Sequence, residues 1–297
     1  MVRRQANTNR LYALSLARPI LVPLILLVLV VLLRVIDIMV LPFAERWGEA
    51  FLHKALGFVL VLAYLWAVGR SVAAIGLHRR RADSALWIGA AGTILLYVLA
   101  FGAQGIVSGI AGKQPALVVA ATDNKTGLAR PGVSFALWLL LGNVVNAFME
   151  ESFFRGLMLP HFRLRLSPWR ANLLQAVIFG LWHLIWPLRH LVAGRIDVAA
   201  ALSESITILV ASTLSGLVWG YMFLKTDSLW TSWIAHMINN STLNLLHIRT
   251  TGGLDAGIAL LYPVLALACL ALLFWIKGWA RWLHMPELTP WGASRES

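Results

Sequence analysis

The chain has 297 residues, of which 59% are hydrophobic and only 13% are charged, and its mean hydropathy is +0.75. Soluble domains have about 25% charged residues, so this composition excludes an ordinary soluble protein and predicts an all-α integral membrane protein, whose helices satisfy their own backbone hydrogen bonds in lipid. The net charge of +12 would suggest nucleic acid as the partner of a soluble protein, but no basic stretch alternates with exposed aromatic residues, so we expect no nucleic acid and a lipid bilayer as the partner.

Apolar stretches near the length that a bilayer requires recur along the whole chain. They predict one integral membrane domain, residues 1–297, that is a polytopic bundle of about eight transmembrane helices at about 20–42, 55–69, 85–106, 133–159, 171–187, 198–224, 228–247 and 256–277. An even number of spans places both termini on one side, and the segments of that side carry roughly twice as many Lys and Arg as the others. We therefore expect a multi-pass protein of the cell membrane with both termini cytoplasmic.

Three segments outside the central helices have their own patterns. Arg34 and Asp37 lie one turn apart in the first predicted helix, where we expect a structural ion pair that reaches toward the interface. Residues 107–132 form a long polar connection, which predicts an outer loop with a short interfacial helix at about 116–121. The final stretch, about 286–297, predicts a disordered tail.

The most unusual stretch is the hexad from Glu150 to Arg155, because it places two adjacent carboxylates and a guanidinium inside an apolar helix. A charge near the middle of a bilayer costs about 2.5–3.5 kcal/mol on insertion scales, so such groups usually have a function. Helical spacing puts Arg155 one turn after Glu151, where the two can pair, whereas Glu150 lies about 100° around the helix. We interpret Glu151 as structural and Glu150 as available for chemistry.

Two later helices carry complementary polar groups. Phe179 and His183 are four residues apart in the fifth predicted helix, and His236 and Asn240 have the same spacing in the seventh. Each alone could be an ordinary packed or hydrogen-bonded residue. At 1.5 Å per residue, however, Glu150 and these three polar groups can share one layer nearer the inner face, where they could supply a general base, a proton shuttle and oxyanion donors.

These motifs, E-E-x-x-x-R, F-x-x-x-H and H-x-x-x-N in that order, resemble the CPBP (Abi) family of intramembrane proteases, which includes the type II CAAX prenyl endopeptidases. The resemblance covers about 133–247, the expected catalytic core. It implies an endopeptidase that acts on a membrane-associated protein or peptide, in which Glu150 and His183 activate a water molecule. His236 and Asn240 would stabilise the oxyanion, and Glu151, Arg155 and Phe179 would support the site.

The residues leave alternatives open. A membrane Glu, Arg and His could also serve a proton-coupled transporter, although matching inverted repeats are not evident, and a non-catalytic immunity or scaffold protein could keep the same fold. Glu150, His183 and His236 could instead hold zinc. We expect no metal and no cofactor, because a metal ligand role would consume Glu150 as the base and the H-E-x-x-H pair of many zinc proteases is missing.

Overall fold

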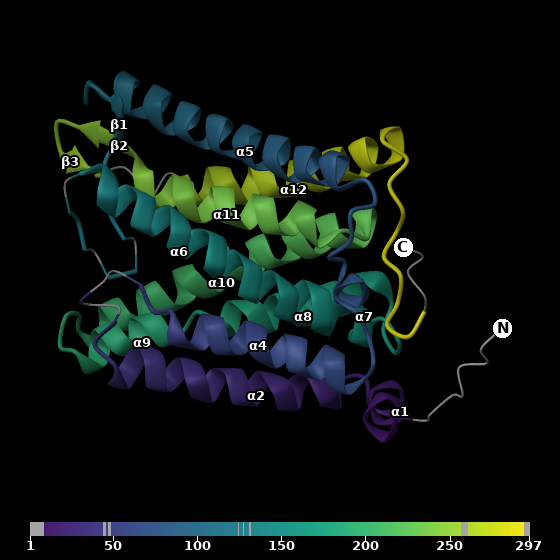
Figure 1. Cartoon of the computed structure of the whole chain (residues 1–297). Helices are drawn as coiled ribbons and strands as arrows, with labels where there is room; N and C mark the ends of the chain where they lie inside the picture. Colours follow the sequence, from purple (N-terminus) through teal and green to yellow (C-terminus); the bar gives the residue numbers. More distant parts are fainter. Residues whose placement is uncertain are drawn as a thin grey trace.

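The computed structural model describes residues 9–43, 46, 49–123, 125–126, 128–130, 132–256 and 261–293, with no side-chain description at 261–263. The described chain is almost entirely helical, and its helices lie side by side in one bundle (Figure 1). The longer helical elements are α2 (Leu21–Val35), α4 (Leu52–Ala67), α5 (Ala82–Ile110), α6 (Val133–Glu151), α8 (Pro168–Trp182), α10 (Val198–Thr226), α11 (Leu229–Leu245) and α12 (Leu261–Trp282). The shorter ones are α1 (Arg10–Ala17), η1 (Ile36–Val40), η2 (Val72–Ile75), η3 (Ser152–Met158), α7 (Leu159–Phe162) and α9 (Ile185–Val192).

The predicted fold class is confirmed, since the chain is a polytopic helical membrane protein. Six helical runs of the described residues are long and apolar enough to cross a bilayer: Leu21–Val40, Ala82–Ile110, Val133–Phe162, Pro168–Val192, Val198–Thr226 and Val264–Trp282. The other two predicted spans are helices as well, but α4 has 16 residues and α11 has 17, so at 1.5 Å per residue they extend only about 24–26 Å. Six full-length spans and two shorter helices thus replace the eight similar spans of the prediction.

Small residues let the central helices approach closely. A Cβ built at Gly220 of α10 would lie 1.9 Å from Oδ1 of Asn172 on α8, and one at Gly89 of α5 would lie 2.2 Å from the carbonyl oxygen of Thr231 on α11. No side chain fits at either position without moving backbone or buried amides. The helices that carry the candidate site residues are therefore held at short interaxial distance.

The end of the bundle that includes β1 differs from the prediction. Residues 116–119 form strand β1 (Ala116–Val119), not an interfacial helix, and β1 pairs antiparallel with β2 (Leu246–Thr250), which pairs with β3 (Gly253–Leu254). The register places Ala116 opposite Arg249 and Val119 opposite Leu246. The seventh predicted helix therefore ends at Leu245: the backbone N of Leu246 donates to the carbonyl oxygen of Thr242, and from Leu246 on the chain pairs with β1, so His247 lies in β2.

The opposite end is crossed by the C-terminal segment, so the prediction of a disordered tail from about 286 is wrong for the described residues up to 293. Trp291 is buried, stacks on His161 with 4.1 Å between ring centroids, and donates from Nε1 to Ser15 Oγ at 3.2 Å. Thr289 donates to the Asp227 carboxylate from its backbone N and its Oγ at 3.1 Å and 2.8 Å. These contacts hold the segment in place, and local composition does not predict them. Residues 294–297 lie outside the described residues.

Glu287 in the same segment pairs with Lys225 at the end of α10. The hydrogen bond and the charge of Lys225 hold the pKa of the Glu287 carboxyl below its usual value. Because Glu287 is largely exposed, this pair contributes little to stability.

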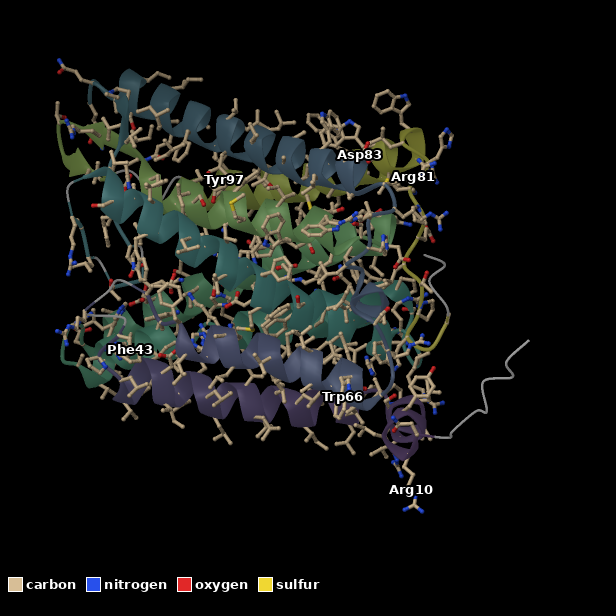
Figure 2. All side chains as sticks on the ribbon, in the orientation of Figure 1. Arg10, Phe43, Trp66, Arg81, Asp83 and Tyr97 are labelled. Atoms are coloured by element: carbon tan, nitrogen blue, oxygen red, sulfur yellow. The ribbon has the colours of Figure 1, made fainter. Side chains whose placement is uncertain are left out.

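Both described terminal segments lie at this end, since Tyr12 of α1 donates to the carbonyl oxygen of Gly292 at 3.4 Å. Figure 2 shows Arg10 and Arg81 there and Phe43 at the opposite end. We predict that a topology reporter at the C-terminus and one inserted near Asp123 fall on opposite sides of the membrane, with the C-terminal one cytoplasmic because of the basic residues at its end. Protease protection of both fusions provides the measurement. The C-terminal reporter should be protected in intact cells and cleaved in inverted vesicles, and the reporter near Asp123 should show the opposite. The reverse result for both reporters would contradict the orientation.

Candidate active site

The two carboxylates of the hexad lie where the helix changes its geometry. α6 ends at Glu151 and continues as the π-helical segment η3, whose following residue Leu159 donates from its backbone N to the carbonyl oxygen of Phe154, five residues back. Pro160 does not end the helix: α7 carries the helical run on to Phe162. π-Helical segments are rare and frequently lie at functional sites.

Glu150 is 2% exposed, and its two carboxylate oxygens have different surroundings. Oε1 accepts a hydrogen bond from Nε1 of Trp182 at 2.8 Å and one from Nη1 of Arg34 at 3.3 Å. Oε2 has no hydrogen-bond partner among the described atoms and lies 3.7 Å from Nε2 of His236. One oxygen is thus anchored, and the other is available for an exchangeable partner.

Glu151 is fully buried and has two cationic or donor partners on one oxygen. Its Oε1 accepts from Nη1 of Arg155 at 2.9 Å, which is the pair that the helical spacing predicts, and from Nδ1 of His236 at 2.8 Å. The contact with His236 joins α6 to α11. Glu151 therefore contacts both Arg155 and His236 through one oxygen, and its Oε2, like that of Glu150, has no hydrogen-bond partner among the described atoms.

An aromatic group packs around these charges. The Arg155 guanidinium lies 4.2 Å from the ring centroid of Phe179 and 5.3 Å from that of Trp219, within the range of cation–π attraction. His236 stacks on Trp219 with 4.1 Å between ring centroids and 20° between ring planes. Phe179 also contacts His236 edge-on at 6.0 Å, so it lies at the centre of this group.

His183 is half-buried just after the end of α8. Its Nδ1 lies 2.8 Å from the carbonyl oxygen of Phe179, four residues back. A carbonyl oxygen can only accept, so Nδ1 carries the proton and Nε2 keeps a lone pair in the neutral ring.

Asn240 lies one turn beyond His236 on α11 and is half-buried. Its Oδ1 accepts from Nδ2 of Asn239 at 3.1 Å, which leaves the Nδ2 donors of Asn240 for another acceptor. Asn239 in turn accepts from the Tyr97 hydroxyl at 2.8 Å. The described contacts thus join Glu150, Glu151, Arg155, Phe179, His183 and His236 in one cluster, with Asn240 beside it.

Two members of the cluster were not anticipated from the sequence. Arg34 was expected to pair with Asp37, but it bonds to Glu150 across the bundle, and Trp182 was not singled out although it directly precedes His183. The only available signal for Arg34 was its charge within an apolar helix, which is the same signal that marked Glu150. Trp182 gave no signal, because tryptophan is common in apolar helices.

The geometry of the cluster also bears on metal binding. Among the described residues there is no group of three or more His, Cys, Asp or Glu arranged to hold a metal ion. Nδ1 of His236 is engaged with Glu151 and Oε1 of Glu150 with Trp182, so a metal would have to be bound by Nε2 of His236 and Oε2 of Glu150.

A comparison with known families selects the same part of the chain. Residues 132–242 match the family described as type II CAAX prenyl endopeptidase Rce1-like. This Rce1-like segment confirms the resemblance to CPBP and CAAX-type proteases that the three motifs predict, and it contains all seven candidate residues from Glu150 to Asn240. The matched residues do not include α2 or α4. No curated protein and no solved structure was found to match the chain.

Glu151 provides a test of the structural role that the sequence predicts for this residue. We predict that Glu151→Ala lowers expression and the thermal unfolding midpoint, since stranding one partner of a buried pair costs about 3–5 kcal/mol and Arg155 is fully buried. Thermal unfolding in one fixed detergent is the measurement. Glu150→Gln is the control, because the amide oxygen can still accept from Trp182 and Arg34, and Arg34 also keeps His53 as an acceptor. A midpoint that falls equally in both variants contradicts the distinction between the two carboxylates.

Proposed function

We propose that the protein is an intramembrane endopeptidase that hydrolyses a peptide bond in a membrane-associated protein or peptide. The observation that carries the proposal is the position of Oε2 of Glu150, which lies 3.7 Å from Nε2 of His236 and has no hydrogen-bond partner among the described atoms, while Trp182 and Arg34 hold Oε1. A buried acceptor of this kind is satisfied by a water molecule, and a carboxylate beside that water is a general base. The Rce1-like segment supports the same class of protease.

In the proposed reaction, Oε2 of Glu150 takes a proton from the water as its oxygen attacks the scissile carbonyl carbon. The carbonyl oxygen becomes the oxyanion of a tetrahedral intermediate. Collapse of the intermediate breaks the carbon–nitrogen bond, the leaving amine receives the proton, and the products are a carboxylate and an amine.

His183 suits the transfer of that proton. Since its Nδ1 donates to the carbonyl oxygen of Phe179, its Nε2 is the basic nitrogen and can share the water with Glu150. We assign to it the shuttle between the attacking water and the leaving amine.

His236 and Asn240 supply the donors for the oxyanion in this proposal. Nδ1 of His236 is held by Glu151, so donation from Nε2 requires a proton on both ring nitrogens. Asn240 would donate from Nδ2, whose companion Oδ1 is already occupied. Donors in a site that excludes water stabilise developing charge strongly.

We further propose that the protein resides in the cell membrane with both termini cytoplasmic. The described terminal segments meet at one end of the bundle. Arg163 in the turn between α7 and α8 and Arg170 in the first turn of α8 are basic residues of the kind that favour the cytoplasmic side. Substrate would then be a protein or peptide anchored in the same bilayer.

A variant series tests the reaction. We predict that Glu150→Gln lowers turnover by about 10²–10⁴-fold without loss of folding, the usual contribution of a general base, and that Asn240→Ala lowers it by on the order of 10²–10³-fold. The purified protein in lipid nanodiscs is assayed with quenched-fluorescent peptides that do or do not end in a prenylated cysteine, together with proteomics of membranes that contain the wild type or Glu150→Gln. Activity in Glu150→Gln with a folded but dead Glu151→Gln would reverse the assignment of the two carboxylates, and no cleavage by the wild type in either assay would overturn the proposed function.

We propose that catalysis needs no metal ion. The prediction is that active protein contains less than stoichiometric zinc and keeps its turnover during a chelator titration, because Glu150 acts as the base and Glu151 is committed to Arg155 and His236. Elemental analysis of the same active sample is the measurement. One zinc per chain that is lost together with activity, and that restores activity when added back, would overturn the proposal.

A further inference from the structure

A chain of buried polar contacts reaches Glu150 from outside the Rce1-like segment. Arg34 near the end of α2 is 4% exposed, and its Nη1 lies 3.3 Å from Oε1 of Glu150 and 3.3 Å from Nε2 of His53 on α4. Nδ1 of His53 lies 2.7 Å from Oδ2 of Asp37 in η1. The backbone N of His53 donates to the same oxygen at 2.9 Å, so Asp37 holds both the ring and the start of α4.

The donors and acceptors of this chain assign its protons. Nη1 of an arginine has two hydrogens and cannot accept, so one can serve Glu150 and the other Nε2 of His53. Nε2 must therefore be the unprotonated nitrogen, and Nδ1 carries the hydrogen that is donated to Asp37. A neutral His53 in one tautomer, oriented by a carboxylate, presents an acceptor that directs one N–H of Arg34 and leaves the other for Glu150.

Trp182 strengthens the same arrangement. The Arg34 guanidinium lies 3.9 Å from the centroid of the Trp182 ring, while Nε1 of Trp182 donates to the oxygen of Glu150 that Arg34 also contacts. Both partners therefore act on Oε1. Their joint effect is to fix the rotation of the carboxylate so that Oε2 points away from them and toward His236.

We infer that Arg34 is a positioning residue for Glu150, and that Asp37 and His53 hold Arg34 in turn. The inference deepens the proposed function and rests on it. It assigns the orientation and the charge of the proposed base to α2, η1 and α4, which the Rce1-like segment does not include. α2 and α4 would then be part of the catalytic apparatus and not only of the membrane scaffold. It also gives a reason for an arginine, a histidine and an aspartate to be buried together in apolar helices, where unpaired charges are costly.

The decisive experiment uses the full chain in lipid nanodiscs and two readouts. The first is kcat and KM of Arg34→Gln, Arg34→Lys and His53→Leu with the peptide that the wild type cleaves. Arg34→Gln should lower kcat by on the order of 10²-fold with little change in KM, the size of effect expected when a catalytic group is misplaced by about 1 Å. Arg34→Lys should recover a substantial part of kcat because it restores a cation, and His53→Leu should show an intermediate loss.

The second readout does not depend on turnover. Dicyclohexylcarbodiimide is apolar and reacts with protonated carboxyl groups, so mass spectrometry of the peptide that contains Glu150 reports whether Arg34 keeps this side chain ionised and covered. The wild type and Arg34→Lys should resist modification, and Arg34→Gln should be modified.

A double variant, Glu49→Gln with Lys54→Gln, is the matched control. It removes another buried ion pair at the start of α4 that makes no hydrogen bond to Glu150 among the described contacts. Burial by itself would raise the pKa of the Glu49 carboxyl. The charges of Lys125 and Lys54 outweigh this effect and hold that pKa below its usual value, so Glu49 is charged at neutral pH. The control should keep kcat and the resistance of Glu150 close to those of the wild type.

The outcomes separate this inference from the proposed function. An active wild type with an unchanged kcat in Arg34→Gln overturns the inference and leaves the endopeptidase standing. Equal carbodiimide modification of Glu150 in wild type and Arg34→Gln overturns it whether or not a substrate is cleaved. A wild type that cleaves nothing, with modification that depends on Arg34, overturns the proposed function while it supports the contact that orients Glu150.

Discussion

Charges inside a helical membrane protein must be compensated within the bundle, because lipid offers neither water nor counterions to them. In this protein the constraint is concentrated at two neighbouring carboxylates, which leave α6 about 100° apart and therefore take their hydrogen-bond partners from different helices. Glu151 is compensated by Arg155 one turn later and by His236 on α11. Glu150 is compensated by Arg34 on α2 and by Trp182 on α8. Two adjacent residues thus determine how four elements meet.

The same compensation explains the aromatic character of the interior. Arg155 retains an unpaired Nε and Nη2 among the described contacts, and the faces of Phe179 and Trp219 lie over its guanidinium. A ring face attracts a cation without adding a charge or a hydrogen that needs a partner. The cluster therefore balances two carboxylates with two guanidinium groups and separates them from lipid by rings. Such an environment also strengthens any dipole that is directed at developing charge.

The difference between the two carboxylates is more informative than their shared burial. Each carboxylate has partners on Oε1 and none on Oε2 among the described atoms. The partners of Glu151 are Arg155, one turn further along its own helical run, and Nδ1 of His236 on α11. The partners of Glu150 come from α2 and α8, and its Oε2 lies 3.7 Å from Nε2 of His236. A buried acceptor beside a second polar group is where a transient water can bind, and a general base needs that position.

Local spacing determined much of this protein. The apolar stretches determined the helical membrane class. The four-residue separations of Glu151 from Arg155 and of Phe179 from His183 predicted contacts that the structure contains. Residues one turn apart share a helix face whatever surrounds them. Partners from distant helices could not be read in this way. Arg34 pairs with Glu150 across more than a hundred residues instead of with nearby Asp37, strand pairing ends α11 before His247, and Trp291 packs on His161 where composition predicts disorder. Each of these depends on which surfaces the folded bundle brings together, and only the tertiary structure decides that.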